Sequence, residues 1–130
     1  MNKTIALASL LLICPACQQQ GWDGWESPQT DNEYARIAEG RGIASHWGIL
    51  FEVEEPGEGG VSSSAHDQAG FPKPEDNWLI RTTNLGEVTI VLEKRGSAPI
   101  ALSINGKSYP AKVGDTFFID KARNVVVNEY

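Results

Sequence analysis

Short stretches in which apolar residues recur at every second position constrain this chain more than any other feature. Two such stretches carry three apolar residues each: Ile49, Phe51 and Val53, then Val88, Ile90 and Leu92. Successive side chains of a strand point to opposite faces, so this period predicts strands with one buried face and one face in water. Further strands are expected at 78–83, 100–104, 116–119 and 125–129.

The dipeptide Asn105-Gly106 is the strongest turn signal in the chain, because both residues adopt the positive φ of a two-residue type I′ hairpin. Such a turn places Ile104 opposite Lys107. Pro110 has no backbone N–H, so the returning strand is expected at a sheet edge or at a bulge. One core should form from the apolar faces of these strands, made of Val88, Ile90, Leu92, Leu102, Ile104, Phe117 and Ile119.

One short helix is expected before the strands. Thr30 and Asp31 are suitable N-cap residues, the next apolar residues fall at helical spacing, and Gly40 can end the helix. Those spaced residues are Tyr34, Ile37 and Ala38. The predicted fold is therefore mainly β, a small antiparallel β-sandwich or barrel with one short N-terminal helix, formed by a single domain over residues 32–130.

Residues 55–76 hold four Gly, three Pro and three consecutive Ser without an apolar pattern. We expect a long loop there, and loops of that length are typically functional or disordered. The segment 62–67 contains Ser, His and Asp, the residue types of a hydrolytic triad. A triad draws its members from separate segments, and no G-x-S-x-G turn is present, so a solvated loop is the favoured interpretation.

The first sixteen residues have the layout of an export signal, with Lys3 before an apolar run and small residues at its end. The run is shorter than the roughly 20 residues that a membrane-spanning helix needs. The stretch 13–17 resembles a lipobox in its final Ala-Cys and departs from that pattern at Cys14 and Pro15. A lipid on Cys17 is our preferred expectation, and free secretion or an uncut leader are the alternatives.

Charge and cysteine content narrow the classes of function. The chain has 11 Lys and Arg against 17 Asp and Glu, a net charge of −6, and loss of the leader with Lys3 leaves 10 against 17. This acidity argues against a nucleic-acid partner and against electrostatic attachment to anionic lipid, so membrane contact should depend on the Cys17 lipid. Cys14 and Cys17 lie at the leader and not in a βαβ unit, which disfavours a thiol redox site.

Four residues are candidates for binding a partner. Residues 17–31 are polar and Gly-rich and should form a flexible tether, in which Trp22 and Trp25 could cap the domain or meet a ligand. His66 and Phe71 lie in the expected 55–76 loop. We expect no cofactor and no catalytic residue. We also expect no metal site, because the two histidines lack metal-ligand spacing. The predicted function is that of an exported, lipid-anchored cell-envelope protein that acts as a small non-catalytic binding or structural module, with an envelope protein or glycan as its partner. The alternative is a small secreted hydrolase or enzyme inhibitor that uses the 55–76 loop.

Overall fold

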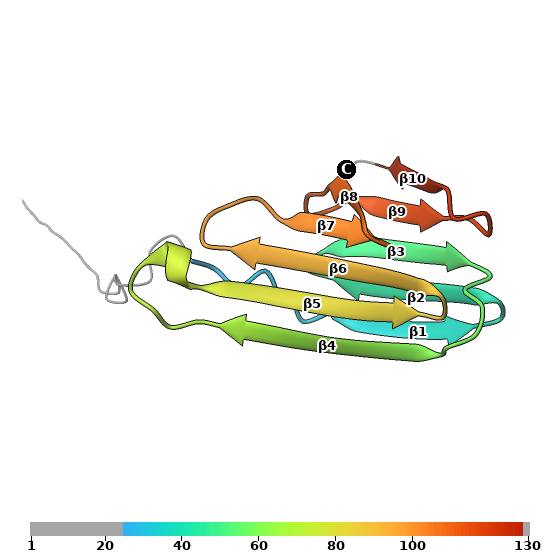
Figure 1. The fold of residues 1–130 in the computed structure, drawn as a ribbon, viewed down its shortest axis with the longest axis horizontal. Helices are drawn as coiled ribbons and strands as arrows, with labels where there is room; N and C mark the ends of the chain where they lie inside the picture. The colour runs from blue at the N-terminus through green and yellow to red at the C-terminus, as the bar shows by residue number, and fades with distance from the viewer. Residues whose placement is uncertain (1–24, 129–130) are drawn as a thin grey trace, which may run out of the picture.

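The computed structural model describes residues 25–128, and it consists of two five-stranded sheets packed face to face (Figure 1). The first sheet contains, in spatial order, β1 (Tyr34–Ala38), β2 (Arg41–His46), β3 (Ile49–Glu54), β9 (Thr116–Ile119) and β10 (Val125–Asn128). The second sheet contains β4 (Val61–Gln68), β5 (Trp78–Leu85), β6 (Val88–Arg95), β7 (Ala101–Ile104) and β8 (Lys107–Pro110). A short 3-10 helix, η3 (Pro74–Asp76), precedes β5.

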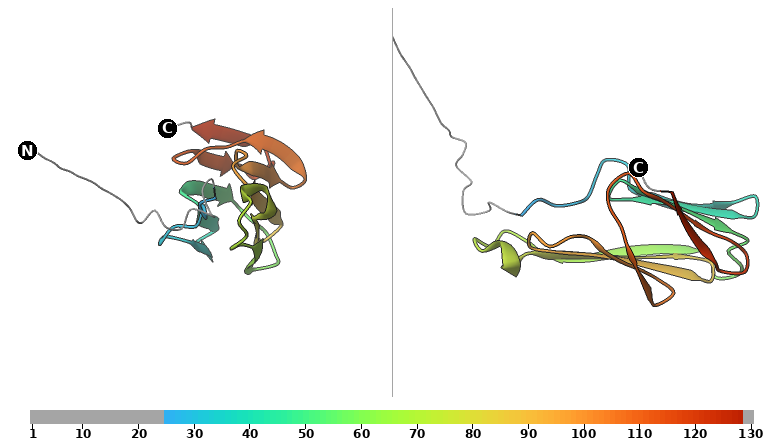
Figure 2. Two further views of the ribbon diagram at one scale, coloured as in Figure 1. Left: turned by 90° about the vertical axis from the view of Figure 1, so that its left-hand side faces the viewer. Right: turned by 90° about the horizontal axis from the view of Figure 1, so that it is seen from above.

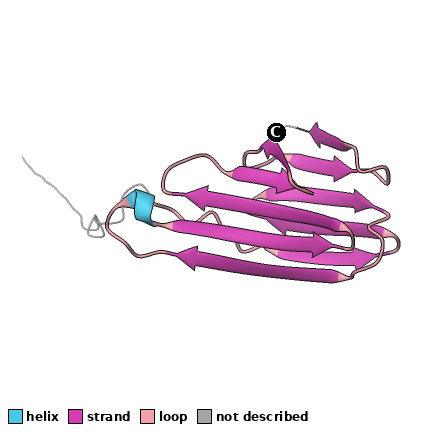
Figure 3. Cartoon of the chain, viewed as in Figure 1, coloured by secondary structure: helices cyan, strands magenta, loops and turns pink. Residues whose placement is uncertain are grey.

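The two sheets form separate layers, which the end-on and top views show clearly (Figure 2). Neighbouring described strands are antiparallel except β3 and β9, which are parallel. This parallel pair arises because the chain leaves the first sheet after β3, builds the whole second sheet, and then returns beside β3. The prediction of a mainly β fold is confirmed, and strands dominate the described residues (Figure 3).

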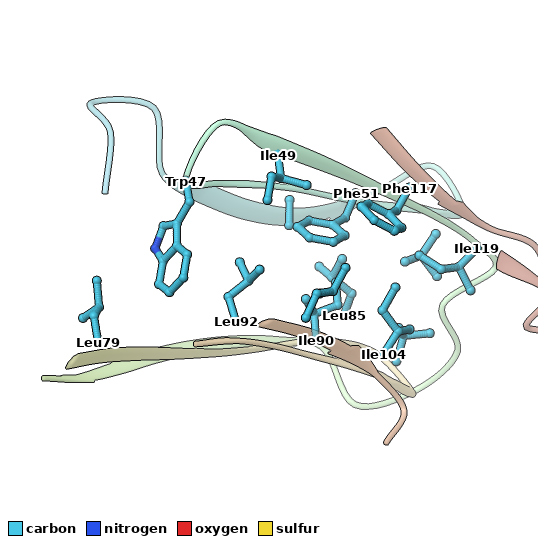
Figure 4. Close-up of a cluster of buried hydrophobic side chains, with 14 residues drawn as sticks. Trp47, Ile49, Phe51, Leu79, Leu85, Ile90, Leu92, Ile104, Phe117 and Ile119 are labelled. Atoms are coloured by element: carbon cyan, nitrogen blue, oxygen red, sulfur yellow. The ribbon is translucent and has the colours of Figure 1, made fainter. Parts of the chain in front are cut away.

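A single apolar core fills the space between the sheets (Figure 4). All seven residues expected in the core are at most 3% exposed. The first sheet contributes Phe51 and Phe117, whose rings stack with centroids 5.6 Å apart, and the second sheet contributes Ile90 and Leu92 from β6. Alternation along these strands therefore predicted which face is buried.

The hairpin at Asn105-Gly106 is also confirmed. The two residues have φ of 51° and 85°, as a type I′ turn requires. Ile104 pairs with Lys107, and β8 is the last strand of its sheet, in agreement with the position of Pro110.

The prediction of a helix near residues 30–40 is wrong. Residues 34–38 form β1, which pairs with β2 through a two-residue turn at Glu39 and Gly40, both at positive φ. Ala35 and Ile37 pack against the core, so the segment follows the period of a strand. The helical spacing of its apolar residues was overruled because pairing with β2 satisfies the backbone of β1 and buries its inner face.

The prediction of an uninterrupted loop over residues 55–76 is wrong as well. Its centre, Val61–Gln68, is β4, which pairs with β5 along its whole length. The residues of β4 show no apolar alternation because seven of the eight are exposed. Here the long neighbouring strand β5, and not burial of an apolar face, determines the secondary structure.

Truncation inside the core should be costly. We expect Ile90→Ala to lower the free energy of unfolding by about 2–5 kcal/mol, because the deleted atoms leave a cavity between the sheets. Val126→Ala is the matched control: Val126 is 58% exposed on β10, so its truncation should change stability by less than about 0.5 kcal/mol. Urea unfolding followed by tryptophan fluorescence measures both, and equal losses would contradict this core.

Candidate functional site

The outer face of the second sheet gathers aromatic, basic and polar side chains at one end. On β4 and β5, His66 pairs with Ile80 and Gln68 pairs with Trp78, which in turn pairs with Arg95 of β6. The alternate residue Leu79 is buried in the core, so Trp78 and Ile80 face outward, where each is half-buried. We call these five residues, His66, Gln68, Trp78, Ile80 and Arg95, the outer patch.

Trp78 and Arg95 form the centre of the outer patch. The Arg95 guanidinium lies 5.5 Å from the centroid of the Trp78 ring, within reach of a cation–π interaction. Arg95 also forms an ion pair with Glu93 on the same strand. Exposed Trp and Arg are enriched where proteins contact partners, because they offer a large contact area together with hydrogen-bond donors.

Phe71 lies in the connection between β4 and η3, at the end of the sheet that carries the outer patch, and is 43% exposed. Its backbone N–H donates to Oδ1 of the fully buried Asn77 at 2.9 Å, and Asn77 Nδ2 donates to the Phe71 carbonyl at 3.1 Å. Asn77 directly precedes Trp78, so these bonds hold Phe71 at the end of the sheet where Gln68 and Trp78 pair. The structure thus brings two predicted binding residues, His66 and Phe71, to one region.

The other predicted site residues are placed differently. Trp25 is half-buried and packs against the core, and the neighbouring residues 26–28 line a groove of about 520 Å³ together with the loops at 97–100 and 111–113. Trp22 and Cys17 lie outside the described residues, as does the expected leader. The described part of the expected tether therefore lies against the domain.

A partly buried polar cluster that the sequence did not predict links the two sheets along the side where β1 and β4 lie; its His46 and Thr83 are buried, and its Ser63 is exposed. It contains Glu33, His46, Ser63, Arg81 and Thr83, and we call it the edge cluster. Glu33 Oε1 lies 2.9 Å from His46 Nδ1, and His46 Nε2 lies 2.9 Å from Thr83 Oγ1. Thr83 Oγ1 lies 2.9 Å from Ser63 Oγ, to which Arg81 Nη1 donates at 2.7 Å.

The direction of each hydrogen bond in the edge cluster follows from Glu33, the group at one end of the chain of bonds. The carboxylate of Glu33 can only accept, so His46 Nδ1 carries the proton that lies between them. In the neutral ring Nε2 then accepts from the hydroxyl of Thr83, which accepts from Ser63 in its turn. Glu33 also accepts the backbone N–H of Trp47 at 2.7 Å and that of Thr30 at 2.9 Å.

The environment of the edge cluster shifts two pKa values. Burial lowers the pKa of His46 below its ordinary value of 6.5, and nearby Arg81 adds to this effect, which outweighs the opposing hydrogen bond to Glu33. Burial alone raises the pKa of Glu33, but hydrogen bonds from Trp47, Thr30 and His46 outweigh it, so the net pKa is lowered from 4.5. The cluster therefore holds a neutral histidine beside a charged carboxylate.

Hydrolytic triads also contain an acid, a histidine and a hydroxyl joined by hydrogen bonds, so the edge cluster is relevant to the alternative that the protein is a hydrolase. The hydroxyl next to His46 belongs to Thr83, which is fully buried, and the one exposed hydroxyl of the cluster, Ser63, reaches His46 only through Thr83. A nucleophile must touch its substrate, so this geometry favours a structural link between the sheets. On β4, His66 faces outward and Asp67 faces the opposite way.

Comparison with known protein families, characterised proteins and solved structures finds no match to this chain. Within residues 25–128, no helix has the length and apolar composition to cross a membrane. The same range brings no three His, Cys, Asp or Glu side chains together in a metal-binding arrangement.

The edge cluster should make stability depend on pH. Because the folded pKa of His46 lies below 6.5, the unfolded state binds more protons as the pH falls through 6.5, and the native state loses stability there. The lowered pKa of Glu33 acts in the same direction below pH 4.5. We expect the melting temperature to fall as the pH is lowered from 7.5 to 5. His46→Gln should make this dependence of melting temperature on pH less steep. The control His66→Gln, at the exposed histidine of β4, should keep the original dependence; equal slopes in all three proteins would contradict the assignment.

Proposed function

We propose that this protein is an exported, lipid-anchored, non-catalytic module that binds a cell-envelope protein or glycan through the outer patch and Phe71. The observation that carries the proposal is the Trp78–Arg95 pair on the outer face of the second sheet, which also carries His66. Outward-facing aromatic rings are not required by the core, since the inner faces already bury its apolar residues.

The scaffold suits such a role, because binding residues are usually displayed on a rigid framework. β5 and β6 pair over eight residues each and carry both halves of the Trp78–Arg95 contact. Buried Asn77 fixes the backbone of Phe71 next to them. Less ordering entropy is lost on binding when contact residues are held in place in the free protein.

The anchor follows from the leader and not from the described fold. We expect the mature protein to begin at a lipidated Cys17 and to partition into the detergent phase. Cys17→Ser should release it into the soluble fraction, whereas the control Cys14→Ser should leave the anchor in place because position 14 is removed with the leader. Mass spectrometry of the native N-terminus checks this directly, and an unmodified terminus at Cys17 or beyond would remove the anchor from the proposal.

Binding by the outer patch can be tested with a photoreactive residue placed at His66, in membranes of cells that make the protein. We expect an adduct with an envelope component, and we expect Trp78→Ala to reduce its yield at least about tenfold, since truncation of a central aromatic costs about 2 kcal/mol or more. The control is the same photoreactive residue at Val126, which is also exposed but lies on the other sheet. Equal adducts from both positions would contradict the proposed surface.

A further inference from the structure

The free edge of β4 is the least protected sheet edge among the described strands. β4 ends the second sheet, runs for eight residues in continuous register with β5, and is exposed along seven of them. It contains no Pro, Lys or bulge, which are the usual features that prevent a strand edge from pairing with another chain.

The other sheet edges carry such protection or are short. β8 has four residues and includes Lys107 and Pro110. β10 also has four residues, and the five-residue β1 carries Arg36. Among the described edge strands, a long row of open backbone groups without Lys, Arg or Pro is therefore specific to β4, in which Asp67 is the one acidic residue.

The backbone groups that point away from β5 can be assigned. Gly86 N–H donates to the Gly60 carbonyl at 2.7 Å, so these two residues form a hydrogen-bonded pair in the register of β4 and β5. Such pairs alternate along an antiparallel ladder, so the even-numbered residues of β4 bond to β5. The odd-numbered residues direct their N–H and C=O groups to the free edge, and they are Val61, Ser63, Ala65 and Asp67.

These four residues are complementary to their own copies. When a second β4 runs antiparallel about a two-fold axis at Ser64, Val61 of each copy lies opposite Asp67, and Ser63 lies opposite Ala65. Every edge N–H and C=O of the four residues then has a partner. A shift by two residues in either direction leaves Val61 or Asp67 without an opposite residue in β4, so this register is the one that satisfies the whole edge.

We propose that a second copy of this chain is the occupant of the β4 edge, so that two second sheets join into one continuous ten-stranded sheet. Charge permits this approach despite the net charge of −6, because each Asp67 faces Val61 and not its own copy. At the axis two small side chains meet, Ser64 opposite Ser64, and on either side of it the short Ser62 lies opposite the larger His66. The two outer patches then lie on one surface. Self-pairing of β4 does not depend on what the outer patch binds.

Disulfide trapping on the full chain tests both the dimer and its register. At the axis Ser64 forms a pair without backbone hydrogen bonds, where Cα atoms are about 4.5 Å apart, within the range that a disulfide spans. Ser62 and its copy are four residues out of register, about 13 Å apart. We expect Ser64→Cys to form a covalent dimer at least about tenfold faster than the control Ser62→Cys, which is also exposed, because only the first geometry can close the bond. The unsubstituted chain corrects for Cys14 and Cys17.

Sedimentation equilibrium of the unsubstituted chain gives an independent readout. We expect the apparent mass to rise from that of a monomer to that of a dimer as the concentration increases. Ala65→Pro should return it to the monomer value, because proline removes an N–H that points to the free edge. A monomer at all concentrations, or equal trapping by Ser62→Cys and Ser64→Cys, would overturn the proposal. Trapping of Ser64→Cys on another protein alone would assign the edge to a foreign strand and would also overturn the self-pairing.

Discussion

A histidine buried between two sheets needs a hydrogen-bond partner at each ring nitrogen, and much of this sandwich is arranged to provide them. His46 is 1% exposed and lies at the end of β2, between a carboxylate that precedes the first sheet and a hydroxyl of the second. An unpaired buried polar group costs about 1–3 kcal/mol. Glu33 and Thr83 therefore constrain how the two sheets can lie relative to each other along this side.

The carboxylate of Glu33 also helps to hold the turn between β2 and β3. Trp47 has φ of 58°, a conformation that bulky residues rarely adopt, and Gly48 follows at 77°. The backbone N–H of Trp47 donates to Glu33, and its side chain is fully buried in the core. A strained backbone persists only where surrounding contacts hold it, and here a hydrogen bond and a buried indole do so together.

The sequence predicted those parts of the fold in which one strand face is apolar, and it failed where the strand is determined by its neighbour. β3 and β6 were predictable because alternate residues are buried, whereas β4 has no apolar face to reveal it. The edge cluster could not be anticipated because Glu33 and Thr83 are 50 residues apart and meet only after both sheets form. His66 and Phe71 were named as candidates because they lie in the expected 55–76 loop, whereas Trp78 was not named because it matches the pattern of an ordinary strand residue.

The absence of an apolar face on β4 has a structural consequence as well. Ser63 directs its side chain toward the inner layer and bonds to Thr83 and Arg81, so β4 is attached to the sandwich through backbone pairing and polar contacts. Segments with few buried apolar contacts open at lower free energy than the core. A strand added at the free edge would satisfy the unpaired backbone groups of β4 and oppose that opening. The polarity that conceals β4 in the sequence is thus also what leaves its edge available to another chain.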